Sequence, residues 1–211
     1  MGFDLAQMHG LIADLVSHKL SVAESMLALI DECEHGRPHP DWSKLRELPY
    51  GDLSPLIDWV QEPFREEPPP VPLRGLWFGL FNPCLEDNTP VADMYVCGSE
   101  RFEPDPHDNS WACGPDWWPD SRYANSTVLA ELYSIAYRRS PQATDKEGCL
   151  GNDAEYPLCL GFGAFTVREL LEQIEPSLIL GRSDRLGVAI GFDSGDFLLL
   201  GELTKGGIES I

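Results

Sequence analysis

The sequence predicts an α+β fold, in which an antiparallel β-sheet of four or more strands is covered by helices and follows a helical N-terminal section. Three features predict it: a hairpin pattern at residues 185–203, two strand-like segments between residues 73 and 97, and helix-type periodicity through residues 1–70. We expect residues 71–211 to form the α+β domain and to make one compact unit with the helical section.

The hairpin at residues 185–203 is the clearest element. Bulky apolar residues at every second position from Leu186 to Phe192 alternate with glycine and alanine, which is the period of a strand. Residues 193–196 are a turn sequence, and residues 197–200 return as an apolar run. One face of the first strand is therefore thin, and either a helix packs on this face or a ligand groove lies over it.

Helix-type patterns account for the first third of the chain. Residues 4–19 place apolar side chains on one face, and Ser21 with Glu24 forms a capping box that opens the next helix. Ser54 precedes a proline that suits the first turn of another helix, and the three prolines at residues 68–70 end it. These prolines mark the linker to the predicted sheet.

Residues 73–81 and 91–97 are predicted to form a second hairpin, because aromatic and apolar residues favour strands in both. Gly75 and Gly79 lie an even number of residues apart, so this hairpin also has a thin face. We expect it to lie antiparallel to the hairpin at residues 185–203 in the same sheet.

Two helices are expected in the C-terminal half. Ser126 is an N-cap for a helix that extends to about residue 139, and residues 155–174 form the most apolar helix pattern of the chain. We expect both helices to cover the sheet, with Gly161 and Gly163 allowing the second helix to approach the thin face.

The chain is strongly acidic. Its 211 residues include 35 Asp and Glu against 15 Lys and Arg, a net charge of -20, and acidic residues outnumber basic ones in every third of the sequence. This balance argues against binding to nucleic-acid phosphates or to anionic membranes, which need clustered basic side chains. It keeps copies of the chain apart in solution, and it also suits the capture of a basic protein partner.

We expect a cytoplasmic protein with free thiols. The first ten residues lack the basic and apolar regions of a signal peptide, and no apolar run reaches the roughly 18 residues that a membrane span needs. The six cysteines are scattered and form no Cys-x-x-Cys pair, which argues against a zinc site. They are Cys33, Cys84, Cys97, Cys113, Cys149 and Cys159.

Motifs for catalysis or cofactor binding are missing from the sequence. The two glycines at residues 161–163 lie inside a helix pattern and do not match a dinucleotide fingerprint. Asp193 and Asp196 flank the hairpin turn, where an ordinary turn is favoured over a carboxylate pair or a cation site. Cys97 or Cys113 would need a base to act as a nucleophile, and the sequence places none nearby. We therefore expect no cofactor, no metal and no catalytic residue.

Residues 98–124 are the candidate functional segment. They follow no helix or strand period, are rich in proline and aspartate, and hold three tryptophans within eight residues. So long a loop is either a lid whose tryptophans fill its own small core, or a binding surface in which tryptophans and carboxylates contact a partner. The predicted partner-binding residues are Glu100, Glu103, Asp105, Asp108, Trp111, Asp116, Trp117, Trp118 and Asp120.

Several strings within residues 73–203 resemble a family of uncharacterised bacterial proteins: GLWFGLFNP, ADMYVCGSERF, WACGPDWWPDSRYANS, GNDAEYPLCLGFGAF and GVAIGFDSGDFLLLG. In size, acidity and lack of catalytic motifs the chain is also similar to bacterial toxin-immunity proteins. The net charge and the segment at residues 98–124 lead to the hypothesis of a non-enzymatic binding protein that sequesters a basic partner, such as a toxin domain. The alternative is an enzyme or sensor with a small-molecule pocket over the glycine-bearing faces, and the oligomeric state stays open.

Overall fold

The computed structural model describes residues 4–36, 38–86, 90–137, 154–193 and 195–209. They form an α+β fold, as predicted, with helices at the N-terminus and a five-stranded mixed sheet. The chain divides into two compact units: the first is Met1–Asp52, Asn82–Asp93 and Ser126–Phe165, and the second is Leu53–Phe81, Met94–Asn125 and Thr166–Ile211. This division differs from the predicted boundary at residue 70, because the helix that follows residue 53 groups with the sheet.

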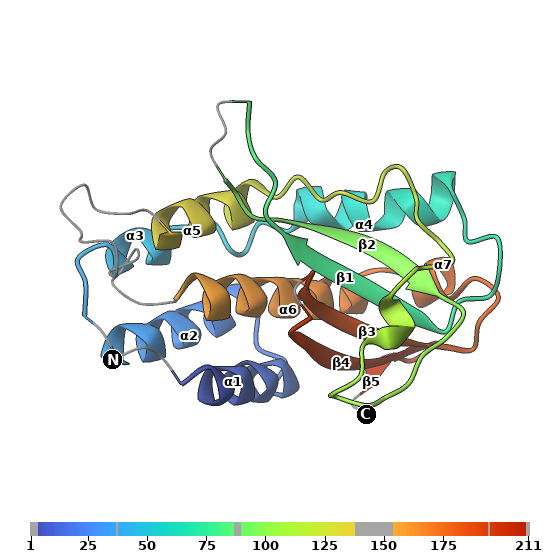
Figure 1. The fold of residues 1–211 in the computed structure, drawn as a ribbon, viewed down its shortest axis with the longest axis horizontal. Coiled ribbons are helices and arrows are strands. Elements are labelled where there is room, and N and C mark those ends of the chain that lie inside the picture. Colours follow the sequence, from blue (N-terminus) through green and yellow to red (C-terminus); the bar gives the residue numbers. More distant parts are fainter. Residues whose placement is uncertain (1–3, 37, 87–89, 138–153, 194, 210–211) are drawn as a thin grey trace. The chain divides into compact units, whose positions relative to one another are not determined.

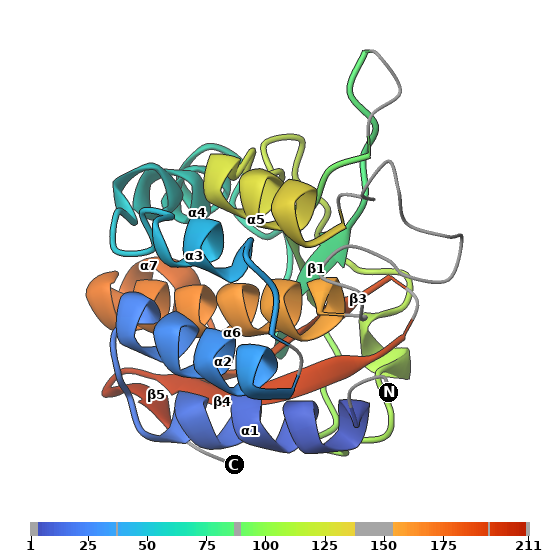
Figure 2. The same ribbon diagram turned by 90° about the vertical axis from the view of Figure 1, so that its left-hand side faces the viewer.

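The first unit is helical (Figures 1 and 2). Its elements are α1 (Leu5–Ser17), α2 (Val22–Gly36), α3 (Trp42–Arg46), α5 (Thr127–Tyr137) and the first part of α6 (Glu155–Gln173), which continues into the second unit. A short connection joins α1 to α2, and the two helices lie side by side in both views.

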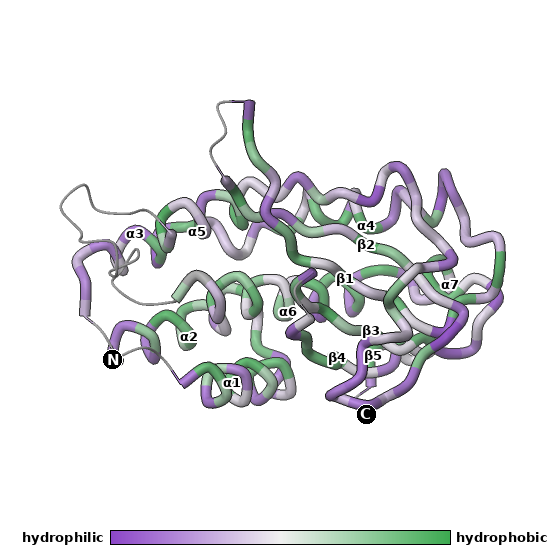
Figure 3. The backbone as a smooth tube through the Cα atoms, in the orientation of Figure 1, coloured by the Kyte–Doolittle hydropathy of each residue, from purple (hydrophilic) through white to green (hydrophobic). Residues whose placement is uncertain are grey.

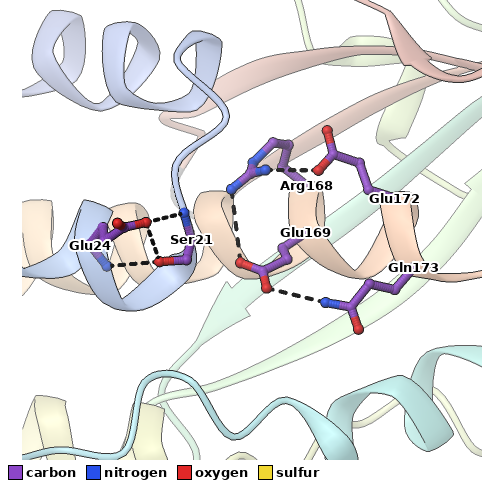
Figure 4. Close-up of polar contacts among 6 residues, drawn as sticks. All are labelled: Ser21, Glu24, Arg168, Glu169, Glu172 and Gln173. Carbon is purple, nitrogen blue, oxygen red and sulfur yellow. Dashed lines mark hydrogen bonds and ion pairs between the residues drawn. The ribbon is translucent and has the colours of Figure 1, made fainter.

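Two predicted helix starts are confirmed in this unit. Before α2, the Glu24 N–H donates to Ser21 Oγ over 3.3 Å, and the Glu24 carboxylate accepts the Ser21 N–H over 3.1 Å (Figure 4). At the start of α5, the Leu129 N–H donates to Ser126 Oγ over 3.2 Å. In each case a side chain satisfies a backbone N–H that the first helical turn leaves without an acceptor.

Gly161 gives α6 a close contact with other helices of the first unit. A methyl group at Gly161 would overlap the side chain of Leu29 on α2 and would lie 3.7 Å from Ile12 on α1. The prediction that Gly161 lets this helix approach the thin face of the sheet is therefore wrong. The missing side chain makes room for a neighbouring helix instead.

The second unit contains the sheet (Figure 1). Its strands are β1 (Gly75–Phe81), β2 (Asp93–Ser99), β3 (Arg185–Phe192), β4 (Phe197–Thr204) and β5 (Gly207–Glu209), in the order β2-β1-β3-β4-β5. The unit also holds α4 (Ser54–Glu66), α7 (Pro176–Leu180), the end of α6 and a 3-10 turn, η1 (Ser110–Ala112).

Two hairpins meet at the centre of this sheet. The hairpin of β3 and β4 is antiparallel, as predicted. In the other hairpin, the Arg74 N–H donates to the Ser99 carbonyl over 2.8 Å, which joins the start of β1 to the end of β2. The inner strands β1 and β3 run parallel, so the predicted antiparallel arrangement of the two hairpins is not found. A parallel pair needs a long crossover, and residues 82–184 provide one.

The parallel register sets glycine beside glycine. Gly75 pairs with Gly187 and Gly79 pairs with Gly191, so one face of the sheet carries two patches of bare backbone. Among the described residues, aromatic side chains lie over these patches rather than an α-helix or an open ligand groove, so both interpretations of the thin face are corrected. Ring atoms occupy the space above all four glycines: Trp111 above Gly75, Tyr95 above Gly79, Phe102 above Gly187, and Trp77 above Gly191.

The opposite face of the sheet packs against a helix of the same unit. Trp59 of α4 contacts Phe78 of β1 edge to face, with ring centroids 6.3 Å apart. At the end of α6, Arg168 is buried and pairs with Glu172 over 2.9 Å (Figure 4). Figure 3 shows β1 as mostly white to green, whereas the stretch after β2, residues 100–110, is mostly purple. The apolar core of this unit is therefore centred on the sheet.

A substitution at Gly191 would test this close packing. A methyl group there would lie 2.5 Å from the Asp196 carbonyl oxygen and 2.7 Å from the Trp77 ring. We expect Gly191→Ala to lower the free energy of unfolding by about 1–3 kcal/mol, as overpacking does, in urea titrations followed by tryptophan fluorescence. Gly206→Ala is the matched control, because its methyl group would meet nothing closer than 3.6 Å. Equal stability of the two variants would contradict the packing described.

Candidate partner-binding site

Part of the candidate segment, residues 98–124, lies over the glycine-bearing face of the sheet. Phe102 and Trp111 contact each other edge to face, with ring centroids 5.1 Å apart. Trp111 also contacts Trp77 of β1 at 6.3 Å and is 2% exposed. The side chain of Asn109 donates to a backbone carbonyl in the β3–β4 turn over 3.1 Å. The segment is thus an ordered cover with an aromatic core of its own.

The segment returns along the outer edge of β2. The Trp117 N–H donates to the Gly98 carbonyl and the Gly98 N–H donates back, both over 3.0 Å. Farther along, the Val96 N–H donates to the Arg122 carbonyl over 3.1 Å. The stretch of β2 from Val96 to Gly98 is shorter than the stretch of returning chain that pairs with it, Trp117 to Arg122. The surplus residues of the returning chain, 118–121, therefore bulge away from the strand.

Trp117 directly precedes this bulge and is buried. Its side chain is 4% exposed, and its ring lies 4.6 Å from the ring of Phe64 on α4. Its Nε1–H donates to the backbone carbonyl of Glu67 over 2.7 Å. The prediction that Trp111 and Trp117 contact a partner is therefore wrong. Both rings are core groups, because bare sheet backbone and the apolar face of α4 give them somewhere to pack.

Glu67, the residue that follows α4, fixes the backbone of the bulge. Its carboxylate accepts the N–H groups of Asp120, over 2.8 Å, and of Ser121, over 3.1 Å, and it accepts the Ser121 hydroxyl over 2.9 Å. We call these three bonds the Glu67 clamp. Hydrogen bonds to the ionised carboxylate lower the pKa of Glu67 below its ordinary value.

Trp118, at the start of the clamped bulge, is 46% exposed. The Arg122 guanidinium carbon lies 4.5 Å from the Trp118 ring centroid and 4.3 Å from that of Tyr123. The cation thus contacts both rings. It also donates to the Pro119 carbonyl over 2.8 Å. Trp118 keeps a large exposed area while the groups around it are held in place.

Further aromatic rings extend this exposed cluster. Tyr95 of β2 contacts Trp118 edge to face, with ring centroids 5.2 Å apart, and Phe81 of β1 contacts Tyr95 at 5.8 Å. We call the cluster the Trp118 platform, and its members are Phe81, Tyr95, Trp118, Arg122 and Tyr123. Because neighbours already order these side chains, a partner that binds the platform has little conformational entropy to remove.

Some of the predicted acidic residues serve the local fold. The Asp116 carboxylate accepts the Glu100 N–H over 2.8 Å and the Ser99 hydroxyl over 3.2 Å. Asp105 and Asp108 each accept an N–H from two residues farther along, over 2.8 Å, which is the geometry of an Asx turn. All three carboxylates are exposed, yet their hydrogen bonds shape the cover.

The other acidic residues of the segment are available to a partner. Glu100, Glu103 and Asp120 are exposed, and their carboxylates have no hydrogen-bond or ion-pair partner among the described residues. These three residues and Trp118 are the predicted site residues whose side chains are exposed and do not stabilise a turn of the segment.

Two of the residues considered for catalysis, Cys97 and Asp193, are placed as parts of the fold. Burial raises the pKa of the Cys97 thiol to about 12, so the thiolate that a nucleophile needs is scarce at neutral pH. The Asp193 carboxylate accepts the Tyr95 hydroxyl over 2.8 Å. Within the described part of the chain, no three His, Cys, Asp or Glu side chains are grouped to hold a metal ion. The five cysteines found there are free thiols, as expected, and Cys149 lies outside it.

Comparison of the chain with protein-family models, with curated proteins and with solved structures found no match. Over the residues that the structure describes, no helix has both the length and the hydropathy to cross a bilayer. A function can therefore be inferred only from the molecule itself, and the Trp118 platform is its most distinctive exposed feature.

Sequence reasoning missed most of the platform and the clamp. The doublet Trp117-Trp118 could have predicted one buried and one exposed tryptophan. Successive residues of an extended chain point to opposite sides, so burial of one favours exposure of the other. Arg122 and Tyr123 follow closely and could have been added as a cation–π pair. Glu67 lies more than 50 residues before the backbone groups that it binds, and no local pattern marks it.

Trp111 and Trp118 should differ sharply in their effects on stability. We expect Trp111→Ala to lower the free energy of unfolding by about 3–5 kcal/mol, as removal of a buried aromatic ring does. We expect Trp118→Ala to lower it by less than about 1 kcal/mol, since an exposed cation–π contact is the main loss. Urea titrations followed by circular dichroism measure both. A Trp118→Ala loss as large as that of Trp111→Ala would show that Trp118 is a core residue.

The Glu67 clamp should show itself in the pH dependence of stability. We expect Glu67→Ala to lower the urea midpoint at neutral pH, because three hydrogen bonds to the bulge are lost. Since the pKa of Glu67 is lowered in the folded state, the clamp contributes fully above the ordinary value of 4.5 and its contribution is lost as the pH falls through the lowered value.

The midpoints of the wild type and Glu67→Ala should therefore converge in acid. Glu66→Ala is the control, because it removes a neighbouring exposed carboxylate that has no partner among the described residues. A difference between Glu67→Ala and the wild type that persists unchanged at low pH would exclude the clamp as its cause.

Proposed function

We propose that this chain is a non-enzymatic binding protein that captures a basic protein partner on the exposed side of residues 100–123. The proposal is based on Trp118, whose large aromatic side chain is 46% exposed in a bulge that the Glu67 clamp holds in place. Tryptophan is enriched among the few residues that dominate the energy of protein interfaces. A fixed, exposed tryptophan beside other rings suits the centre of such an interface.

The charge of the chain supports a basic partner. Its net charge is -20, and Glu100, Glu103 and Asp120 keep unengaged carboxylates in the same segment as Trp118. A field of this sign raises the rate at which a cationic surface is captured, and salt weakens it. Arg122, a basic residue of the same segment, uses its guanidinium within the bulge, where it contacts the Trp118 and Tyr123 rings and donates to the Pro119 carbonyl.

The most specific form of the proposal is an immunity-type role in bacterial cytoplasm, in which the chain sequesters a basic toxin domain. A domain that acts on nucleic acid carries clustered Lys and Arg for phosphate contacts. An acidic surface with a central aromatic anchor would cover such a cluster and compete with the nucleic acid for it. Nucleic acid and anionic membranes are not proposed as partners, because both would be repelled.

The test is capture and titration of a partner. The immobilised full-length chain is exposed to lysate of its source organism, and a retained basic protein is purified and titrated against the wild type and two variants. We expect Trp118→Ala to weaken the affinity at least about tenfold. Leu85→Ala is the matched control, because Leu85 is a comparably exposed apolar residue, 53% exposed, outside residues 100–123. Equal losses in the two variants would contradict the proposed site.

Charge reversal tests the field separately. We expect Glu100→Lys with Glu103→Lys to slow association and to flatten its dependence on salt, measured by stopped-flow mixing. Asp58→Lys with Glu62→Lys on α4 changes the net charge equally and lies outside the site. If both double variants slow association equally, overall charge alone attracts the partner.

A further inference from the structure

A cavity of about 150 Å³ lies in the second unit, between the proline-rich segment after α4 and the short helix α7. Its walls are mostly apolar and include Phe64, Leu73, Leu178 and Ile179. An apolar cavity of this volume accommodates a molecule about the size of benzene. The volume therefore limits an occupant to a short aliphatic chain or a single ring.

Arg182 is the charged residue in the lining of this cavity. Its Nη2 donates to the Pro70 carbonyl over 2.6 Å, which holds the guanidinium beside the proline-rich wall. An arginine has five N–H donors, so donors remain for a ligand. In the described chain no carboxylate pairs with Arg182, although acidic residues greatly outnumber basic ones.

The walls also fix how a ligand would be oriented. Pro68, Pro69 and Pro72 have no backbone N–H, so they offer an anionic group no hydrogen-bond donor. A carboxylate is thus directed to Arg182, where it can form charge-assisted hydrogen bonds. The apolar body of the same ligand would lie against Phe64 and Ile179.

We propose that this cavity binds a small apolar carboxylate, with Arg182 as the residue that recognises the carboxylate. None of the five platform residues lines this cavity, so carboxylate binding can be tested independently of the proposed capture of a basic protein.

The test uses benzoate, hexanoate and the neutral benzyl alcohol as probes of the full-length chain, with methyl NMR shifts of Leu178, Ile179 and Leu180 as the readout. We expect benzoate and hexanoate to shift these methyl signals saturably. We expect benzyl alcohol, which has the same ring without the charge, to bind at least about tenfold more weakly.

Variants of the arginine complete the test. Arg182→Gln should reduce benzoate affinity to that of benzyl alcohol, and Arg182→Lys should retain most of it because the positive charge is kept. Arg74→Gln is the matched control, since Arg74 is exposed in the same unit and does not line the cavity; it should leave benzoate affinity unchanged. If Arg182→Gln does not fold, the contrast between benzoate and benzyl alcohol in the wild type still decides.

Two outcomes would overturn the proposal. One is the absence of a saturable benzoate shift at these methyl groups in the wild type. The other is equal affinity for benzoate and benzyl alcohol, which would mean that the cavity selects for apolar bulk and that Arg182 only anchors the Pro70 carbonyl.

Discussion

The register of β1 against β3 is the constraint on which the second unit depends. Parallel pairing sets Gly75 beside Gly187 and Gly79 beside Gly191. Glycine backbone has no side chain to pack, so dispersion contacts are lost unless another group fills the space above it. Aromatic rings fill it, and the segment after β2 supplies two of them, Phe102 and Trp111. That segment is thereby part of the hydrophobic core, in a cluster with Trp77, Cys97, Ala189 and Phe197.

The same constraint decides which tryptophan faces solvent. Trp111 is needed above Gly75, and Trp117 is held by Phe64 and by the Glu67 carbonyl. The chain between Trp117 and Arg122 is longer than the strand beside it, so the surplus residues bulge outward with Trp118 among them. The exposure of Trp118 is thus a consequence of how the cover packs, and the Glu67 clamp with Arg122 makes the bulge rigid. In the proposed binding role, that rigidity keeps the entropic cost of association low.

The sequence was most informative where the structure depends on nearby residues. Ser21 with Glu24 identified a helix start, and the alternation from Leu186 to Phe192 identified the β3–β4 hairpin, because both are set by short-range geometry. The parallel pairing of β1 with β3 was not predicted, because register between distant strands is set by the fit of whole faces. The clamp was missed for the same reason, since Glu67 and Ser121 are 54 residues apart. Composition pointed to residues 98–124 as the site, but it did not separate Trp118 from the two buried tryptophans.

The acidic residues of the site divide in the same way. Asp105, Asp108 and Asp116 stabilise turns of the cover, so replacing them would disturb the fold as well as the charge. Glu100, Glu103 and Asp120 contribute charge without a partner in the described chain. Exposed charges act over about a Debye length and mainly affect the rate of encounter, whereas a desolvated aromatic anchor mainly affects the rate of dissociation. In the proposed capture of a basic protein, the carboxylates would therefore determine how quickly the complex forms and Trp118 how long it lasts. The two contributions are physically separable because they reside in different side chains of the same segment.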